Sequence, residues 1–261
     1  GVEVSMSAFF EFFGRGLLNV MEGVGRFFVL LGMTARGVVT PPFSPVATAR
    51  QVVRVGVDSV PVVLLTALFT GGVLALQTFK GFQRFHAEGY IGSVVALSML
   101  RELGPVLTGL MVTGRAGSAM AAELGSMRVT EQIDALVSLA TDPVQYLFVP
   151  RVLASILVVP MLVVLADAIG ILGGYLVAVG YLGANPVVYM NNTFQFLSME
   201  DMTSGLIKAA AFGFLLSLIG CQCGYDTKGG AEGVGLSTTK AVVMGSLAIL
   251  IADFFLTKVL F

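Results

Sequence analysis

Five apolar segments, each long enough to cross a lipid bilayer, constrain the fold of this chain more than any other feature. A helix needs about 20 mainly apolar residues to span roughly 30 Å of hydrocarbon. Charged residues make up only 12% of the 261 residues, whereas soluble domains carry about 25%. We therefore expect an all-α membrane protein with five transmembrane helices. The predicted spans are 57–79, 91–113, 152–180, 204–223 and 241–260.

The first 56 residues differ in character from the five-span domain expected at 57–261. Between residues 7 and 28 the polar side chains recur every three or four positions among phenylalanine, leucine and valine, which predicts an amphipathic helix at the membrane interface. These polar residues are Glu11, Arg15, Asn19, Glu22 and Arg26. The segment TPPFSP (40–45) should end that helix, and a short helix through Arg50 and Arg54 should lead into the first span.

The basic residues near the spans predict the orientation of the chain, because cytoplasmic loops are richer in Lys and Arg. Ten basic residues lie in the N-terminal region and in the loops after spans two and four, against three on the opposite side. This asymmetry places the N-terminus in the cytoplasm and the C-terminus outside. The three external residues are Lys80, Arg84 and Lys258.

Charged residues inside the spans are the unusual feature. Arg101 and Glu102 stand near the middle of ALSMLRELGPVLTGLMVTGRAG (96–117), although a charge at the bilayer centre costs about 2.5–3.5 kcal/mol on insertion scales. Counted from the external ends of their spans, Arg101, Lys208 and Asp253 all fall in the outer half or the centre of the membrane. Asp167 is a further membrane charge whose direction the sequence does not give.

Two roles are open for Arg101, Glu102, Lys208 and Asp253. They could line a cavity that opens outward, or they could form a salt-bridge set that holds the bundle together; the two roles are compatible. Pro105 lacks an N–H, so it should free the carbonyl of Arg101 and open the helix beside the charges.

Phenylalanines follow the first span at three-residue spacing. On a continued helix Phe79, Phe82 and Phe85 form one apolar ridge near the external mouth. Such a ridge could guide acyl chains, or it could anchor the helix at the interface, where aromatic side chains are common.

The segment RVTEQIDALVSLATDP (128–143) follows the second span on the predicted cytoplasmic side. Its charged residues alternate with an apolar face, which predicts a short amphipathic helix. Thr130 is the expected N-cap, and Asp142-Pro143 the expected stop. This helix could transmit force to a soluble partner, or it could lie on the membrane surface.

The sequence offers no catalytic constellation. It has one histidine, His86, and the glycine-rich KGGAEGVG (228–235) lacks the G-K-[ST] ending of a phosphate-binding loop. We expect 228–235 to be a flexible cytoplasmic connection, and we expect this chain to bind no ATP, metal or other cofactor itself. The net charge of −1 argues against a nucleic-acid partner. Cys221 and Cys223 are expected to be helix-packing thiols.

The run ALSMLRELGPVLTGLMVTGRAGSAMAAELGSMRVTEQIDAL (96–136) resembles the signature of the MlaE/YrbE-type permeases of ABC transporters (maintenance of lipid asymmetry). The resemblance continues through TDPVQYLFVPRVLA, GILGGYLVA, LIKAAAFGF and GYDTKGGAEGVGLSTTKAVV, and it covers about 57–261. The first fifty residues match this family in character and not in letters.

The resemblance implies a permease subunit, in a bacterial inner membrane, that moves phospholipid between the inner and outer membranes of a diderm bacterium. It further implies a homodimer, two cytoplasmic ATPase subunits that hold ATP and Mg, and a periplasmic MCE-domain protein. The region from Glu123 to Asp134, with Arg128 and Glu131 between them, then corresponds to the coupling helix.

Two other functions compete with a lipid permease. A secondary transporter would use the buried charges as an ion relay, but such transporters often show paired repeats, and five spans do not pair. A membrane scaffold without transport has no evident need for charges within the membrane.

Overall fold

The computed structural model describes residues 23–38 except 24 and 27, residues 44–85 and residues 87–260. All regular secondary structure within these residues is helical, and five helical stretches are long and apolar enough to cross a membrane. The prediction of an all-α, five-span protein is therefore confirmed. The stretches are Pro45–Phe82, Glu88–Val129, Val144–Gly180, Met199–Tyr225 and Gly230–Leu260.

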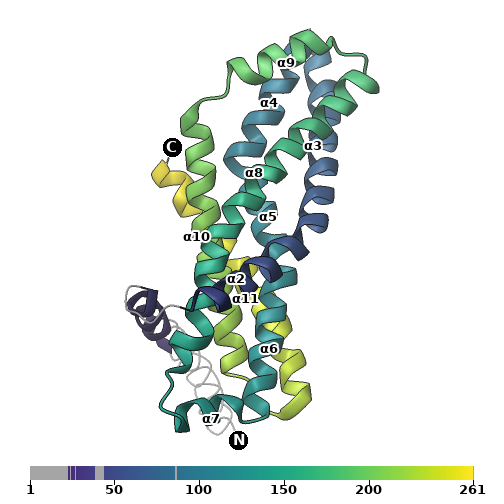
Figure 1. The fold of residues 1–261 in the computed structure, drawn as a ribbon. Coiled ribbons are helices and arrows are strands. Elements are labelled where there is room, and N and C mark those ends of the chain that lie inside the picture. Colours follow the sequence, from purple (N-terminus) through teal and green to yellow (C-terminus); the bar gives the residue numbers. More distant parts are fainter. Residues whose placement is uncertain (1–22, 24, 27, 39–43, 86, 261) are drawn as a thin grey trace, which may run out of the picture.

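The first stretch bends where it enters the span. Helix α2 (Pro45–Val55) is the short helix that was expected through Arg50 and Arg54, and it starts at the N-cap Ser44 with proline in its first turn. A 3₁₀ turn, η1 (Val57–Ser59), then connects it to α3 (Val60–Phe82). Figure 1 shows α2 lying across the bundle and α3 running along it.

The second stretch is a continuous rod that extends well beyond the predicted 91–113. It contains two five-residue π-helical turns, η4 and η5, which interrupt the α-helical hydrogen-bond pattern. Its successive parts are η3 (Glu88–Tyr90), α4 (Ile91–Ser98), η4 (Met99–Leu103), α5 (Gly104–Val112), η5 (Thr113–Gly117) and α6 (Ser118–Val129).

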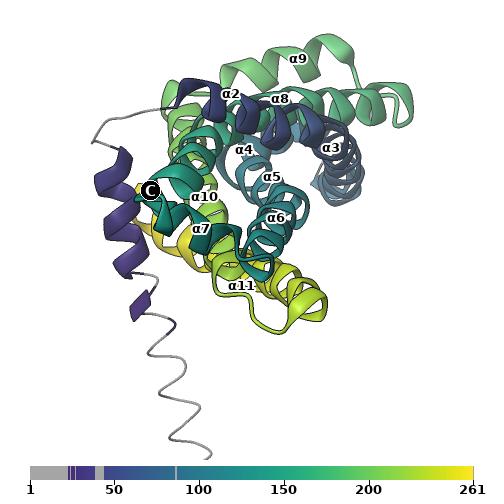
Figure 2. The ribbon, with the colours of Figure 1, turned by 60° about the horizontal axis from the view of Figure 1, so that its bottom comes forward.

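The remaining spans are single helices with short connections. After α6 come α7 (Gln132–Ser138), the π-helical turn η6 (Val144–Phe148), α8 (Val149–Gly180), α9 (Pro186–Gln195), α10 (Met199–Tyr225) and α11 (Gly230–Leu260). Helix α10 is the most enclosed of the spans and packs against α8, α6 and α11. Figure 2, which brings the bottom of the bundle forward, shows α10 between α8 and α11.

One sequence prediction about a connection was wrong, and one helix in a connection was missed. The glycine-rich 228–235 is not a flexible connection, because α11 begins at Gly230 and includes GAEGVG. Glycine is frequent in membrane helices, so a glycine-rich run there does not indicate a loop. Helix α9 was not predicted, although Asn185-Pro186 is a typical helix start: the Asn185 side chain accepts hydrogen bonds from the N–H groups of Val187 and Val188.

Spans α3 and α8 approach so closely that glycine is required where they cross. A Cβ added to Gly71 would overlap the carbonyl oxygen of Gly170, and one added to Gly173 would overlap that of Leu68. Small residues at such crossings let helix backbones make direct contact in membranes. This crossing connects the first span to the third.

The predicted interfacial helix at 7–28 lies almost entirely outside the described residues. The structure does describe a following apolar helix, Phe28–Val38. It packs against the bundle through Leu30 and Thr34, which are both buried. Just before it, Arg26 forms an ion pair of 3.2 Å with Asp226 at the end of α10.

The orientation of the spans can be tested by cysteine labelling. Asn191 on α9 and Lys228 before α11 are both exposed, and an odd number of spans separates them. We expect Asn191→Cys to react with a membrane-impermeant maleimide added outside intact cells, and Lys228→Cys to react only after the cells are opened. The native Cys221 and Cys223 are buried, so the chain without an added cysteine should not react and serves as the control. Labelling of both variants from one side would rule out the five-span topology.

Candidate functional site

The second span opens its backbone at the turn that carries Arg101 and Glu102. Pro105 has no N–H to donate to the carbonyl of Arg101, and the π-helical turn η4 ends with a hydrogen bond from the Gly104 N–H to the Met99 carbonyl. The freed carbonyl of Arg101 instead accepts a hydrogen bond of 3.0 Å from the Nζ of Lys208 on α10. π-Helical turns often occur at functional sites, and here the turn supplies a backbone ligand to a buried ammonium group.

Lys208 is the centre of an ion network that joins three spans. Its Nζ lies 2.8 Å from Glu102 Oε2, 3.2 Å from Asp253 Oδ1 on α11, and 2.8 Å from the Thr257 hydroxyl oxygen. The side chain of Lys208 has no exposed surface. Three of the four charges singled out in the sequence therefore meet, which supports their role as a brace.

Arg101 bonds to a carboxylate that the sequence analysis missed. Its Nε donates a 2.6 Å hydrogen bond to Asp201 Oδ1 at the start of α10. The other oxygen of Asp201 accepts hydrogen bonds from the backbone N–H and the hydroxyl of Ser198, which makes Ser198 and Asp201 a capping box. The spacing S-x-x-D is a visible sequence signal for such a box, so this carboxylate could have been placed at the helix start.

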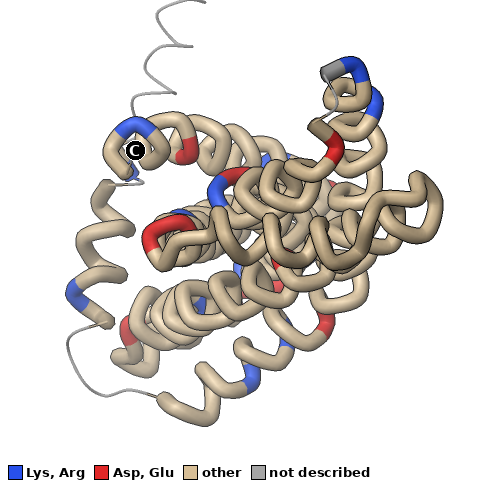
Figure 3. Tube along the Cα trace, turned by 90° about the horizontal axis from the view of Figure 1, so that it is seen from above, with Lys and Arg blue, Asp and Glu red and all other residues tan. Residues whose placement is uncertain are grey.

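The charged side chains of this site differ in how much of their surface is exposed. The side chains of Arg101 and Glu102 are 43% and 38% exposed, whereas that of Lys208 is fully buried. Leu103, the next residue, lines an apolar surface pocket of about 320 Å³. The other lining residues are Phe69, Thr70, Val73, Leu74 and Gln77, all on α3. Arg101 and Glu102 themselves bond to α10 and α11 and do not line this pocket, and Figure 3 shows how few charged positions the helices carry.

Asp167 on α8 faces the same turn from the other side. Its Oδ1 is buried and has no hydrogen-bond partner, and a Cβ added to Gly104 would overlap that oxygen. The side chain of Asp167, whose direction the sequence did not give, therefore points toward the start of α5, immediately after η4. The absence of a side chain at Gly104 is what makes room for this carboxylate.

The predicted phenylalanine ridge follows the outer end of α3. Phe79 and Phe82 are half-buried and pack against the core, while Phe85 belongs to the 3₁₀ turn η2 (Gln83–Phe85). Phe79 also lines a surface pocket of about 340 Å³ together with Leu182 and Tyr189. Burial raises the pKa of the Tyr189 hydroxyl to about 12, so this phenol is neutral at physiological pH.

The segment after the second span forms a sharp corner. Helix α6 ends at Val129 and α7 begins at Gln132, with Glu131 between them in a left-handed conformation (φ 59°). The N-cap prediction for Thr130 was wrong, because its hydroxyl donates back to the Ser126 carbonyl of α6. The stop predicted at Asp142-Pro143 was also wrong: α7 ends at Ser138, and Asp142 accepts a hydrogen bond from the Val144 N–H at the start of the next helical segment.

The corner presents charge and apolar surface together. Arg128 forms an ion pair of 2.6 Å with Asp134 and lies 5.8 Å from the centre of the Tyr225 ring. Ile133 is buried beneath α7, whereas Val137 and Leu139 are 56% and 75% exposed. A short helix, α7, is present in the segment where one was expected, with Ile133 buried and Asp134 and Val137 exposed.

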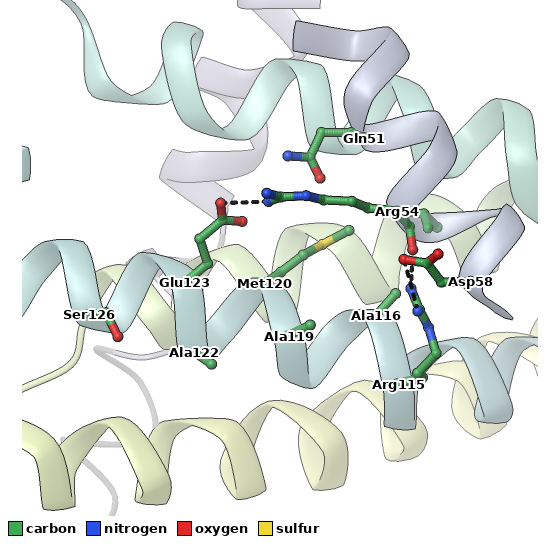
Figure 4. A pocket seen from close by; sticks show the side chains of 11 residues that line it. Gln51, Arg54, Asp58, Arg115, Ala116, Ala119, Met120, Ala122, Glu123 and Ser126 are labelled. Atoms are coloured by element: carbon green, nitrogen blue, oxygen red, sulfur yellow. Dashed lines mark hydrogen bonds and ion pairs between the residues drawn. The ribbon is translucent and has the colours of Figure 1, made fainter.

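Glu123 does not belong to this corner. It lies on α6 and bridges Arg54 on α2, at 2.7 Å, and Arg151 on α8, at 2.8 Å. Figure 4 shows Glu123 and Arg54 facing one another across a pocket of about 550 Å³, with Asp58 and Arg115 paired at its other end. Glu123 therefore joins three helices where the first span bends.

Comparison with known proteins gives a consistent result. The family model described as Permease MlaE matches residues 48–259. The intermembrane phospholipid transport system permease protein MlaE of Haemophilus influenzae is 38% identical over 255 residues, covering 97% of each chain. A probable ABC transporter permease protein of Rickettsia typhi is 47% identical over 248 residues, covering 95% of this chain and 96% of the relative. The chloroplastic protein trigalactosyldiacylglycerol 1 of Arabidopsis thaliana is 42% identical over 214 residues, covering 82% of this chain and 61% of the relative.

Proposed function

Because this chain belongs to the MlaE permease family, we propose that it is the permease subunit of an ABC transporter that moves phospholipid between the inner and outer membranes of a diderm bacterium. Membrane permease function follows from the family itself. The phospholipid substrate is proposed from the name of the Haemophilus relative and from the site described above. The chain would reside in the inner membrane with its N-terminus in the cytoplasm.

The observation that carries this proposal is the pair of half-exposed charges on η4, followed directly in the chain by Leu103, which lines an apolar pocket. A phospholipid has an anionic phosphate and two long acyl chains, so its site needs a cationic group next to apolar surface. Arg101 would hold the phosphate, and the α3 pocket that begins at Leu103 would receive acyl chains. Lys208 and Asp253 would act behind them, by fixing Glu102 and the η4 backbone. Phe79, Phe82 and Phe85 would guide the chains at the outer end of α3.

We propose that the active form is a homodimer with two cytoplasmic ATPase subunits, which hold ATP and Mg, and a periplasmic MCE-domain protein. The names of the Rickettsia and Haemophilus relatives support an ATPase partner and a transport system. The corner formed by Arg128, Glu131 and Asp134 is the proposed docking point for the ATPase. Glu123 would keep α6 rigid between α2 and α8, so that movement of the corner reaches the span.

Reconstitution tests the proposed function. The chain, co-purified with the ATPase and MCE-domain protein encoded beside it, should transfer a fluorescent phospholipid from proteoliposomes to acceptor vesicles only when ATP is supplied. The matched control is the same complex carrying an ATPase subunit unable to hydrolyse ATP. ATP-dependent transfer of an ion or a water-soluble solute, with no transfer of phospholipid, would contradict the proposal.

The docking role of the corner predicts the effect of reversing one charge. Glu131→Lys should weaken binding of the ATPase subunit at least about tenfold, which corresponds to about 1.4 kcal/mol, because a like charge at an interface is strongly unfavourable. Pull-down at increasing salt measures this affinity, and bound lipid should be unchanged. Glu232→Lys, at the exposed first turn of α11, is the control. Equal ATPase binding by the two variants would contradict the proposal that the ATPase docks at this corner.

A further inference from the structure

Helix α9 is fixed against the outer ends of the spans by one of its faces. Tyr189 and Thr193 are buried, at 2% and 1% exposure, and the side-chain amide of Asn192 donates a 2.7 Å hydrogen bond to the Gly89 carbonyl. Gly92 on α4 leaves no room for a Cβ, because the Tyr189 carbonyl oxygen would lie 2.6 Å from it. The helix therefore rests directly on the backbone of α4.

The contacts of Tyr189 show how deep α9 lies. A Cβ added to Gly174 on α8 would lie 2.8 Å from the Tyr189 hydroxyl, and the rings of Tyr189 and Tyr175 meet edge to face with centres 5.6 Å apart. Helix α8 continues to Gly180, which is about 9 Å beyond Gly174 at 1.5 Å per residue. Helix α9 thus flanks the ends of the spans, and Figure 1 shows it lying crosswise to α3 and α4.

The free surface of α9 divides into an apolar ridge and a polar edge. The ridge consists of Val187, Met190 and Phe194, which are 64%, 40% and 67% exposed and share one side of the helix by their spacing of three and four residues. The polar edge, formed by Asn191 and Gln195, is also exposed. No Asp, Glu, Lys or Arg occurs between residues 168 and 199, although connections that face water are usually charged.

We propose that the ridge of α9 inserts into the outer leaflet of the membrane that the spans cross, with the polar edge toward water. An amphipathic helix that lies in the membrane plane buries its apolar face about 5–10 Å into the headgroup boundary. The ends of the adjoining spans continue the apolar surface, with Tyr181 and Met199 each 78% exposed. Tyr90 and Phe196, whose ring centres are 5.9 Å apart, add the aromatic pair expected at an interface. This inference does not depend on what the permease transports.

Tryptophan fluorescence can test the insertion directly, because the chain contains no tryptophan. Phe194→Trp on the ridge and Gln195→Trp on the polar edge each create a single reporter. The full chain is reconstituted into phosphatidylcholine–phosphatidylglycerol vesicles, with either ordinary or dibrominated acyl chains. We expect bromine to reduce the emission of Phe194→Trp about twofold or more, since the reporter would lie at acyl-chain depth. Aqueous iodide should quench Gln195→Trp and spare Phe194→Trp.

Two results would overturn the proposal. Quenching of Phe194→Trp by iodide and not by bromine would show that the ridge faces water. Shielding of Phe194→Trp from both quenchers would show that protein covers the ridge, either a second copy or a partner. Met190→Trp on the same ridge gives an independent reading, so that the outcome does not depend on one variant. Thermal melting of each variant confirms that the reporter has left the fold intact.

Discussion

Lys208→Met should unfold the permease more readily than any other single charge removal in the spans. The substitution leaves Glu102 and Asp253 without their common cation in the membrane. Removing one partner of a buried ion pair costs about 3–5 kcal/mol, because the remaining charge is uncompensated. For a chain of this size that loss corresponds to a fall in Tm of roughly 10 °C. Thermal melting of the purified protein measures it.

Two variants distinguish loss of the network from loss of a lysine. Lys258→Met, at the exposed end of α11, should leave Tm unchanged. Neutralising the partners as well, in Lys208→Met/Glu102→Gln/Asp253→Asn, should recover most of the lost stability, because no charge is then left unpaired. If Lys208→Met melted like the wild-type chain, Lys208 would not brace the bundle.

Gly71→Ala should have the second large effect on stability. Alanine usually stabilises a helix relative to glycine by about 0.5–1 kcal/mol. At Gly71, however, the added Cβ overlaps the carbonyl oxygen of Gly170 on α8, and neither backbone can rotate out of the way. The two spans would have to separate, and overpacking of this kind costs about 3 kcal/mol or more.

Gly81→Ala is the matched control on the same helix. A Cβ at Gly81 meets no atom within 4 Å, so this variant should melt at or slightly above the wild-type temperature. Differential scanning fluorimetry of the two variants gives the comparison. Equal melting temperatures for Gly71→Ala and Gly81→Ala would show that α3 and α8 do not cross as closely as described.

The five spans were predictable because hydrocarbon imposes a simple requirement on length and apolarity. A salt-bridge set among Arg101, Glu102, Lys208 and Asp253 was one of the two roles that the sequence left open. The structure joins Glu102, Lys208 and Asp253 and pairs Arg101 with Asp201 instead. Counting charges within the spans could not find Asp201, which lies at a helix end where an acidic residue is ordinary. Its role became apparent only when the Ser198 capping box placed it opposite Arg101.

The remaining errors share a physical cause. Glycine-rich and turn-like residues were taken to interrupt helices, as they do in water. In a membrane bundle, glycine instead permits close helix contact, so GAEGVG continues α11. At the corner after α6 the chain turns through a left-handed Glu131, a conformation that few non-glycine residues adopt. No sequence pattern indicates glutamate for that position, and Thr130 was the more usual choice of cap.

The central proposal about the site is that Arg101 binds the phosphate of a phospholipid. Its side chain is 43% exposed, and Asp201 keeps two hydrogen bonds from Ser198 when Arg101 is removed. Arg101→Gln should therefore lose less stability than Lys208→Met. This difference allows binding and stability to be measured separately.

The most direct measurement is the phospholipid bound per chain, determined by mass spectrometry on samples whose melting is recorded in parallel. We predict that the wild-type complex and the Lys258→Gln control retain phospholipid, and that Arg101→Gln melts normally but has lost most of it. Full phospholipid retention by a folded Arg101→Gln complex would contradict the claim, and the charges on η4 would then serve only to hold the helices together.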